Sequence, residues 1–235
     1  MTRVLVVTAH PDDVDFGSAG TIAAFTAAGV AVTYCIVTNG DAGGSDRSMP
    51  RAEVAALRQD EQRAAAAVVG VHDVRFLGHP DGMVQVTLEL RRDISRVIRQ
   101  VRPERVITQS PERNWDFIFA SHPDHLAAGE AAVCAVYPDA RNPFAHPELL
   151  QAEGLEPWTV PELWIMGPGG QGAGVAVDTT TTLERKVSAL MCHKSQMPDP
   201  EGVAKLIRGA GTTLGEQAGL PAGSTAEMFR VTRIP

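Results

Sequence analysis

Two short segments of the sequence combine histidine with neighbouring carboxylates at spacings that suit metal-assisted hydrolysis. Residues 10–13 read His-Pro-Asp-Asp, and residues 122–125 read His-Pro-Asp-His. The first segment holds more acid than a turn or a helix cap requires, and adjacent carboxylates repel unless a cation or a helix N-terminus offsets them. Together the two segments indicate a metal centre rather than two unrelated polar turns.

Three side chains of these segments could form a site of two histidines and one carboxylate: His10, Asp13 and His125. Catalytic zinc uses three protein ligands and keeps a further position for water or substrate. The same ligand set holds Fe(II) in oxygenases, so the ligands alone leave two reaction classes open. Asp12 favours a hydrolase, because a carboxylate beside the metal can act as a base toward water.

The elements expected around these segments place both at one edge of a sheet. Val4–Thr8 is a continuous apolar run, typical of a buried parallel strand, and residues 10–13 follow it. Arg105–Gln109 is a second strand of this kind, and residues 122–125 open the helix predicted at Pro123–Tyr137. Ligands of open α/β sheets bind beyond the carboxyl ends of the strands. The two segments are therefore expected to meet.

The rest of the chain alternates strands with helices. Further strands are predicted at Val30–Val37, Val74–Leu77, Leu163–Met166, Val175–Val177 and Phe229–Thr232, and helices at Gly17–Ala28, Arg51–Val69, Leu88–Val101, Leu183–His193 and Val203–Ala210. Such alternation implies right-handed crossovers and a mainly parallel, twisted sheet with helices on both faces. We expect a single Rossmann-like α/β domain over residues 1–235.

Composition excludes several other functions. The chain of 235 residues has 21 basic and 28 acidic side chains and a formal net charge of −7, which argues against a nucleic-acid binder. No window approaches the ~20 apolar residues of a membrane helix. Three well-separated cysteines and the lack of a signal peptide at the start predict a cytoplasmic protein. Whether the chain forms a homo-oligomer is left open.

The two histidine motifs resemble those of the LmbE/PIG-L family of metal-dependent N-deacetylases. Supporting matches run through most of the chain: Thr38-Asn39-Gly40, Arg58-Gln59-Asp60-Glu61, Phe76-Leu77-Gly78, Pro80-Asp81-Gly82 and His193-Lys194-Ser195-Gln196. The resemblance implies a Rossmann-like fold and hydrolysis of an N-acetyl group, typically on a glucosamine unit. The expected cofactor is Zn²⁺, with Fe²⁺ as the alternative, and the expected substrate is a small N-acetylated amino sugar.

The resemblance also assigns roles to individual residues. The metal ligands would be His10, Asp13 and His125. Asp12 would be the general base, which takes a proton from water and later delivers it to the leaving amine. A protonated His122 would stabilise the oxyanion of the tetrahedral intermediate.

Two further residues are candidates for substrate contact. Arg58 could bind a sugar hydroxyl or an acyl oxygen, although a helical arginine followed at i+3 by Glu61 also fits an ordinary ion pair. Asp81 could contact a substrate hydroxyl, although turn chemistry alone explains an aspartate in a Pro-Asp-Gly sequence. The segment His193–Gln196 either borders the site or simply ends a helix.

The sequence departs from the family pattern in one place. Many members have glutamate directly after His-Pro-Asp-Asp, whereas Val14-Asp15 follows here. We expect Asp15 to cap the helix that begins near Gly17. The loops Ala42–Pro50 and Asn142–Gly174 are expected to set substrate specificity.

Three competing functions are considered. An amidase that cleaves a larger amide, such as a thiol conjugate, would use the same residues with a different pocket. An Fe(II) oxygenase would use the same ligands but would not need Asp12. A nucleotide binder would use the glycine-containing residues 17–20 at a helix N-terminus, but the G-x-G-x-x-G spacing is missing and acidic residues precede it.

Overall fold

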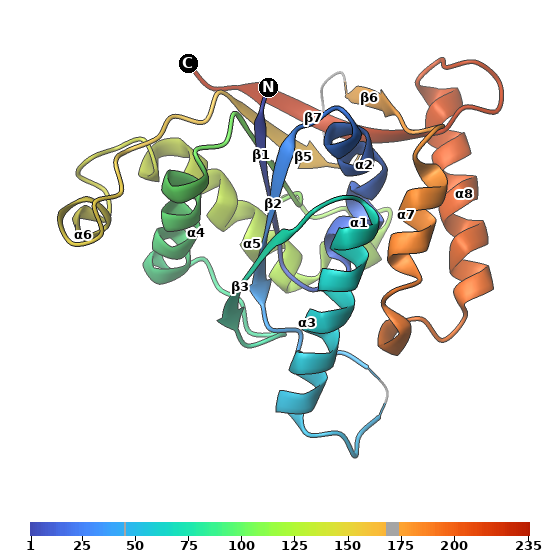
Figure 1. Ribbon diagram of the computed structural model, residues 1–235, viewed down its shortest axis with the longest axis horizontal. Helices are drawn as coiled ribbons and strands as arrows, with labels where there is room; N and C mark the ends of the chain where they lie inside the picture. Colours follow the sequence, from blue (N-terminus) through green and yellow to red (C-terminus); the bar gives the residue numbers. More distant parts are fainter. Residues whose placement is uncertain (45, 168–173) are drawn as a thin grey trace.

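A central twisted sheet with helices on both faces forms the protein (Figure 1). The computed structural model describes residues 1–44, 46–167 and 174–235. Its strands are β1 (Arg3–Thr8), β2 (Ala31–Thr38), β3 (Asp73–His79), β4 (Arg105–Thr108), β5 (Glu162–Met166), β6 (Val175–Asp178) and β7 (Ala226–Arg233). The seven strands found in the described ranges join in the order β3-β2-β1-β4-β5-β7-β6.

The helices connect these strands and cover the sheet. They are α1 (Asp13–Gly17), α2 (Ala19–Ala27), α3 (Arg51–Val68), α4 (Leu88–Val101), α5 (Pro123–Cys134), α6 (Pro147–Gln151), α7 (Leu183–Leu190) and α8 (Pro200–Gln217), with the short turns η1 (Ile118–Ser121), η2 (Ala135–Asp139) and η3 (Lys194–Gln196). None of the helices in the described residues is long and apolar enough to cross a membrane.

Strand pairing confirms the predicted Rossmann-like sheet. β1 pairs in parallel with β2 and β4, and these pair in parallel with β3 and β5. β7 lies antiparallel between β5 and β6. The sheet is thus mainly parallel, and the C-terminal strand supplies its antiparallel part.

β1 is buried on both faces, as its continuous apolar run predicts. Leu5 and Val7 pack into the apolar cluster that includes residues of α4 and α5. Val4 and Val6 point the other way, into the cluster that includes residues of α2 and α3. Successive side chains of a strand alternate between faces, so each layer of helices receives half of the strand. β1 is therefore held firmly at the centre of the sheet, and its carboxyl end is a rigid base for residues 10–13.

Some helix boundaries differ from the predictions. The helix expected at Gly17–Ala28 corresponds to α2 but begins at Ala19, because Gly17 ends α1 and Ser18, with a φ of −149°, separates the two helices. α1 was not predicted. The helix expected to reach Tyr137 ends at Cys134 and is followed by the π-helical turn η2, in which Tyr137 has extended φ and ψ. α6 was not predicted at all.

The C-terminal helices differ as well. α8 is much longer than the expected Val203–Ala210, since it begins at Pro200 with Asp199 as its cap and runs to Gln217. Several glycines in this helix hid its length, because glycine is a poor helix former. α7 ends at Leu190 rather than at His193.

Candidate metal centre

The chain turns sharply after β1 at Asp12. This residue has a φ of +93°, in the left-handed region that side chains other than glycine rarely adopt. The carbonyl of Asp12 accepts the first helical hydrogen bonds of α1, from the amides of Asp15 and Phe16. The turn therefore carries the chain from the end of β1 directly into α1.

The side chains of His10, Asp13 and His125 meet at the carboxyl end of β1. Nδ1 of His10 lies 3.2 Å from Nε2 of His125 and 3.4 Å from a carboxylate oxygen of Asp13. Nε2 of His125 lies 3.0 Å from the other oxygen of Asp13. The structure thus brings together the three ligands predicted from the sequence, although the two segments are distant in the chain.

This arrangement fits a divalent metal. Ligand atoms that bind one tetrahedral zinc ion at ~2.0–2.2 Å lie about 3.3–3.6 Å from each other. The separations of 3.0–3.4 Å, of which the two to Asp13 reach different oxygens of its carboxylate, are close to that range. Two imidazole nitrogens and a carboxylate oxygen are also donors that zinc and iron accept in proteins.

Hydrogen bonds set which nitrogen each histidine offers. Nδ1 of His125 lies 3.4 Å from the carbonyl oxygen of Ala120, so this nitrogen carries the hydrogen and Nε2 keeps a lone pair for the metal. His10 is turned the other way, because its Nε2 lies 3.1 Å from carboxylate oxygens of both Asp81 and Asp124. Its Nδ1 is therefore the nitrogen that faces His125 and Asp13 and is available to a metal, and carboxylates hold the opposite edge of the ring.

Asp124 is itself locked in place. Its side chain is buried, and its two oxygens accept hydrogen bonds from the amides of Gly82 and Val84. The carboxylate thus ties the start of α5 to the loop after β3 and orients His10.

The electrostatics of the centre favour a bound cation. Burial disfavours the charged imidazolium of His10, but hydrogen bonds and charges from Asp13 and Asp81 outweigh burial and raise its pKa to about 11. Burial likewise opposes the charge of Asp13, yet its hydrogen bonds with His10 and His125 hold its pKa below the ordinary value. The same carboxylate raises the pKa of His125 against the effect of burial. Without a metal, protons supply the positive charge that these carboxylates attract.

Asp12 is adjacent in the chain to Asp13 and has a different set of partners from the three predicted ligands. Burial and the adjacent charge of Asp13 raise the pKa of its carboxyl to about 7, although the charge of Arg58 works in the opposite direction. One carboxylate oxygen lies 3.4 Å from Nη2 of Arg58. A carboxyl with a pKa near neutrality can both accept and return a proton, which is what general acid–base catalysis requires.

His122 lies next to the two histidines predicted as metal ligands. Its ring centroid is 4.9 Å from that of His10 and 5.3 Å from that of His125. Its Nδ1 accepts a hydrogen bond from the amide of Asp124, which leaves Nε2 as the protonated nitrogen of the neutral ring. Burial and the charge of His10 lower its pKa. The structure therefore favours a neutral His122 that donates from Nε2, instead of the protonated imidazole we expected.

Arg58 and Asp81 lie at the centre but contact protein groups. The guanidinium of Arg58 is buried and donates to the carbonyls of Pro11 and Gly40. Its Nη1 also lies 3.2 Å from Asp81, whose other oxygen faces His10. Contact of either residue with substrate stays a prediction, and both residues already brace the residues around the metal centre.

Two other expectations for this region were wrong. Glu61 does not pair with Arg58, because its carboxylate accepts hydrogen bonds from the amide and the hydroxyl of Ser195. Asp15 is not a helix cap, because it lies inside α1 and is fully buried. Its carboxylate oxygen lies 2.9 Å from Nε2 of His193.

Gln62 is a residue of this region that we did not single out from the sequence. It is fully buried on α3, accepts a hydrogen bond from the amide of Asp12 and donates one to Asp15. Its position four residues after Arg58 places both on one face of α3. That spacing was the available signal, but the partners of Gln62 depend on how α3 packs against the loop after β1.

The helix N-terminus that a nucleotide binder would use is already filled. The amides of Gly20 and Thr21 donate to the carboxylate of Glu227, at 3.0 and 2.7 Å. Lys186 compensates the buried charge, with its Nζ 2.6 Å from the same carboxylate. A phosphate cannot take this place without displacing Glu227, so the nucleotide-binding alternative was wrong.

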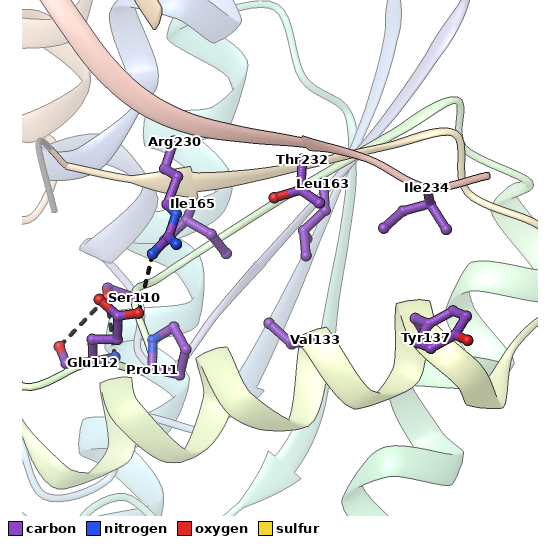
Figure 2. A pocket seen from close by; sticks show the side chains of 10 residues that line it. All are labelled: Ser110, Pro111, Glu112, Val133, Tyr137, Leu163, Ile165, Arg230, Thr232 and Ile234. Atoms are coloured by element: carbon purple, nitrogen blue, oxygen red, sulfur yellow. Dashed lines mark hydrogen bonds and ion pairs between the residues drawn. The ribbon is translucent and has the colours of Figure 1, made fainter. Parts of the chain in front are cut away.

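Two of the pockets in the described part of the molecule lie at different places in the fold. Figure 2 shows one of about 280 Å³ between α5 and η2 on one side and β5 and β7 on the other, without any of the predicted site residues. A second, of about 220 Å³, lies between α3, η3 and the loop after β2, with Gly43 and Gln196 in its lining. Ser45 and residues 168–173, in the two loops expected to set specificity, lie outside the described residues.

Fold and site together define a Rossmann-like α/β protein with a candidate metal centre of two histidines and a carboxylate. The family model of PIG-L, described as GlcNAc-PI de-N-acetylase, matches residues 5–136, which include both histidine motifs. The chain belongs to this family of N-deacetylases. The family and the enzyme class predicted from the sequence are thereby confirmed.

Individual relatives agree with this placement. A diacetylchitobiose deacetylase of Thermococcus kodakarensis is 31% identical over 197 residues, which cover 84% of this chain and 71% of the relative. A probable N-acetyl-alpha-D-glucosaminyl L-malate deacetylase 2 of Bacillus cereus is 32% identical over 83% of both chains. The solved N,N'-diacetylchitobiose deacetylase of Pyrococcus horikoshii superposes with a TM-score of 0.88 and 29% identity, over 99% of this chain and 84% of that one.

Proposed function

We propose that the protein is a zinc-dependent N-deacetylase that hydrolyses the acetamide of a small N-acetylglucosamine-type sugar. The observation that carries this proposal is the convergence of His10, Asp13 and His125 within 3.0–3.4 Å, with the Asp12 carboxyl next to them. A metal site with a spare carboxyl beside it suits hydrolysis, because water must be deprotonated and the leaving amine must be protonated.

The roles of the side chains follow from their positions. A zinc ion held by His10, Asp13 and His125 would supply the Lewis acidity that lowers the pKa of water and polarises an amide carbonyl. Asp12 takes the proton of the attacking water and returns it to the amine nitrogen, which its pKa of about 7 allows in both directions. His122 donates a hydrogen bond from Nε2 to the developing oxyanion.

The substrate class rests on the relatives. Their names describe deacetylases of diacetylchitobiose and of an N-acetylglucosaminyl malate, two compounds that share an N-acetylated glucosamine unit. We therefore place the reacting acetamide on such a unit, with a small group attached to it. An amidase for a larger thiol-conjugate amide would use the same residues, and it remains the alternative substrate class.

A panel of substrates tests the proposal. We expect release of free amine and acetate from N-acetylglucosaminides, loss of this activity after chelation, and its return when Zn²⁺ is added. Equal amounts of a non-acetylated conjugate amide serve as the comparison. Cleavage of that conjugate without any deacetylation would favour the amidase.

The same experiment separates the hydrolase from an oxygenase. An Fe(II) oxygenase with this ligand set would consume oxygen and would be restored by Fe²⁺ alone. Amide hydrolysis in the absence of oxygen supports the hydrolase. Oxygen uptake coupled to turnover would overturn it.

A further inference from the structure

Two side chains of α3 form hydrogen bonds with the two ends of the peptide group that joins Pro11 to Asp12. Nη2 of Arg58 donates to the carbonyl of Pro11 at 2.8 Å. Oε1 of Gln62 accepts from the amide of Asp12, also at 2.8 Å. Residues four apart on a helix lie on the same face, so one turn of α3 fixes both ends of a single peptide plane.

These two hydrogen bonds hold the backbone at a strained residue. Asp12 has a φ of +93°, and non-glycine residues keep such a conformation only where their surroundings enforce it. Rotation about this φ would swing the Asp12 side chain relative to His10 and Asp13, because the side chain leaves the backbone at the next atom. Holding the peptide plane therefore restricts the backbone rotation that would redirect the Asp12 side chain.

Gln62 is in turn oriented by a buried chain of hydrogen bonds through Asp15 to His193. Its Nε2 donates to Oδ2 of Asp15 at 2.8 Å, and Nε2 of His193 lies 2.9 Å from the same oxygen. All three side chains are fully buried. Asp15 can accept from both neighbours but cannot donate when ionised, so Gln62 must present its amide NH₂ to Asp15 and its oxygen to Asp12.

We infer that Gln62, oriented by Asp15 and His193, is a positioning residue that aims the Asp12 carboxyl at the reacting water. This inference rests on the proposed function and adds a role for the departure Val14-Asp15 and for the segment His193–Gln196. The segment is also anchored to α3 through Ser195 and Glu61, next to Gln62 in sequence. The segment after α7 thus supports the turn of α3 that holds the Pro11–Asp12 peptide group.

The first test replaces Gln62 by leucine, which keeps similar size and removes both hydrogen bonds. Expected is a fall in kcat of about 10- to 100-fold with little change in KM, because the base is misdirected while substrate and metal still bind. Metal content should stay equal to that of the wild type. Gln59→Leu, the same change three residues earlier on α3, is the matched control and should leave kcat unchanged.

The second test exchanges the amide of Gln62 and the carboxylate of Asp15 between the two positions. Gln62→Glu sets two carboxylates against each other and should lower kcat. Adding Asp15→Asn restores the pattern, because Glu at position 62 accepts from the Asp12 amide while the amide nitrogen of the new Asn, at the place of Oδ2, donates one hydrogen to that Glu and the other to Nε2 of His193 in its Nδ1–H tautomer. We expect the double variant to recover at least about tenfold in kcat over Gln62→Glu alone. The double variant tests the positioning role of Gln62 even if Gln62→Leu does not fold.

The outcomes separate the two proposals. A wild-type protein that releases no amine from any N-acetylated sugar contradicts the proposed function. An active wild type together with a folded, metal-loaded Gln62→Leu variant of unchanged kcat contradicts only the positioning role. A double variant no better than Gln62→Glu contradicts it as well.

Discussion

Oδ2 of Asp124 lies 3.1 Å from Nε2 of His10, on the edge of the imidazole opposite the Nδ1 atom that faces Asp13 and His125. The carboxylate therefore fixes both the tautomer and the orientation of a proposed metal ligand. It does so from a rigid position, because backbone amides of the loop after β3 hold both of its oxygens. The loop after β3 is thereby coupled to the metal centre.

Replacement of Asp124 by asparagine is expected to weaken metal binding. The neutral amide keeps the shape of the side chain but loses the charge that supports the imidazole of His10, and changes of this kind cost about 10- to 100-fold in affinity or activity. Competition with a coloured chelator measures the metal affinity. Asp116→Asn, at an exposed aspartate of the preceding loop, is the control. Equal affinity in both variants would argue against the orienting role.

The stability of the metal-free protein should fall as the pH rises. The pKa of His10 is raised from 6.5 to about 11, so its contribution is complete below 6.5 and is lost as the pH rises toward 11. The pKa of Asp12 is raised from 3.8 to about 7, so the contribution of this carboxyl to stability also falls as the pH rises, up to about pH 7. Urea unfolding in chelator, from about pH 6.5 to about pH 9, measures the effect. A free energy of unfolding that stays constant or rises over this range would contradict these shifts.

The buried ion pair between Lys186 and Glu227 stabilises the start of α2. Lys186→Met leaves the Glu227 carboxylate without its cation at the start of α2, and we expect a loss of about 3–5 kcal/mol in the free energy of unfolding. Adding Glu227→Gln should recover part of this loss, since no charge is then buried. Arg208→Met, at an exposed ion pair with Glu184, should change stability little. A Lys186→Met variant as stable as Arg208→Met would contradict the account.

The convergence of His10, Asp13 and His125 could be predicted from sequence because each residue follows a simple local rule. His10 and Asp13 come directly after a strand whose apolar run is unmistakable, and His125 lies in the first turn of a helix that proline begins. The edge of a parallel sheet then brings them together. The apolar runs in the sequence likewise predicted the parallel strands.

The supporting residues could not be predicted in this way. Asp15 and Gln62 are partners only because α1 packs against α3, and His193 joins them from beyond α7. A local interpretation made Asp15 a helix cap and Glu61 the partner of Arg58, and tertiary packing overrode both. The position of β7 between β5 and β6 likewise depends on the whole sheet and not on the strand itself.

The central claim is that His10, Asp13 and His125 hold one catalytic metal with Asp12 as the base, and it is tested most directly by measuring bound metal and acetate release in parallel. The account predicts that the wild type binds metal and releases acetate, that Asp12→Asn binds metal but loses about 10²- to 10⁴-fold in turnover, and that His125→Ala loses both. Full turnover by Asp12→Asn, or full metal binding by His125→Ala, would contradict it.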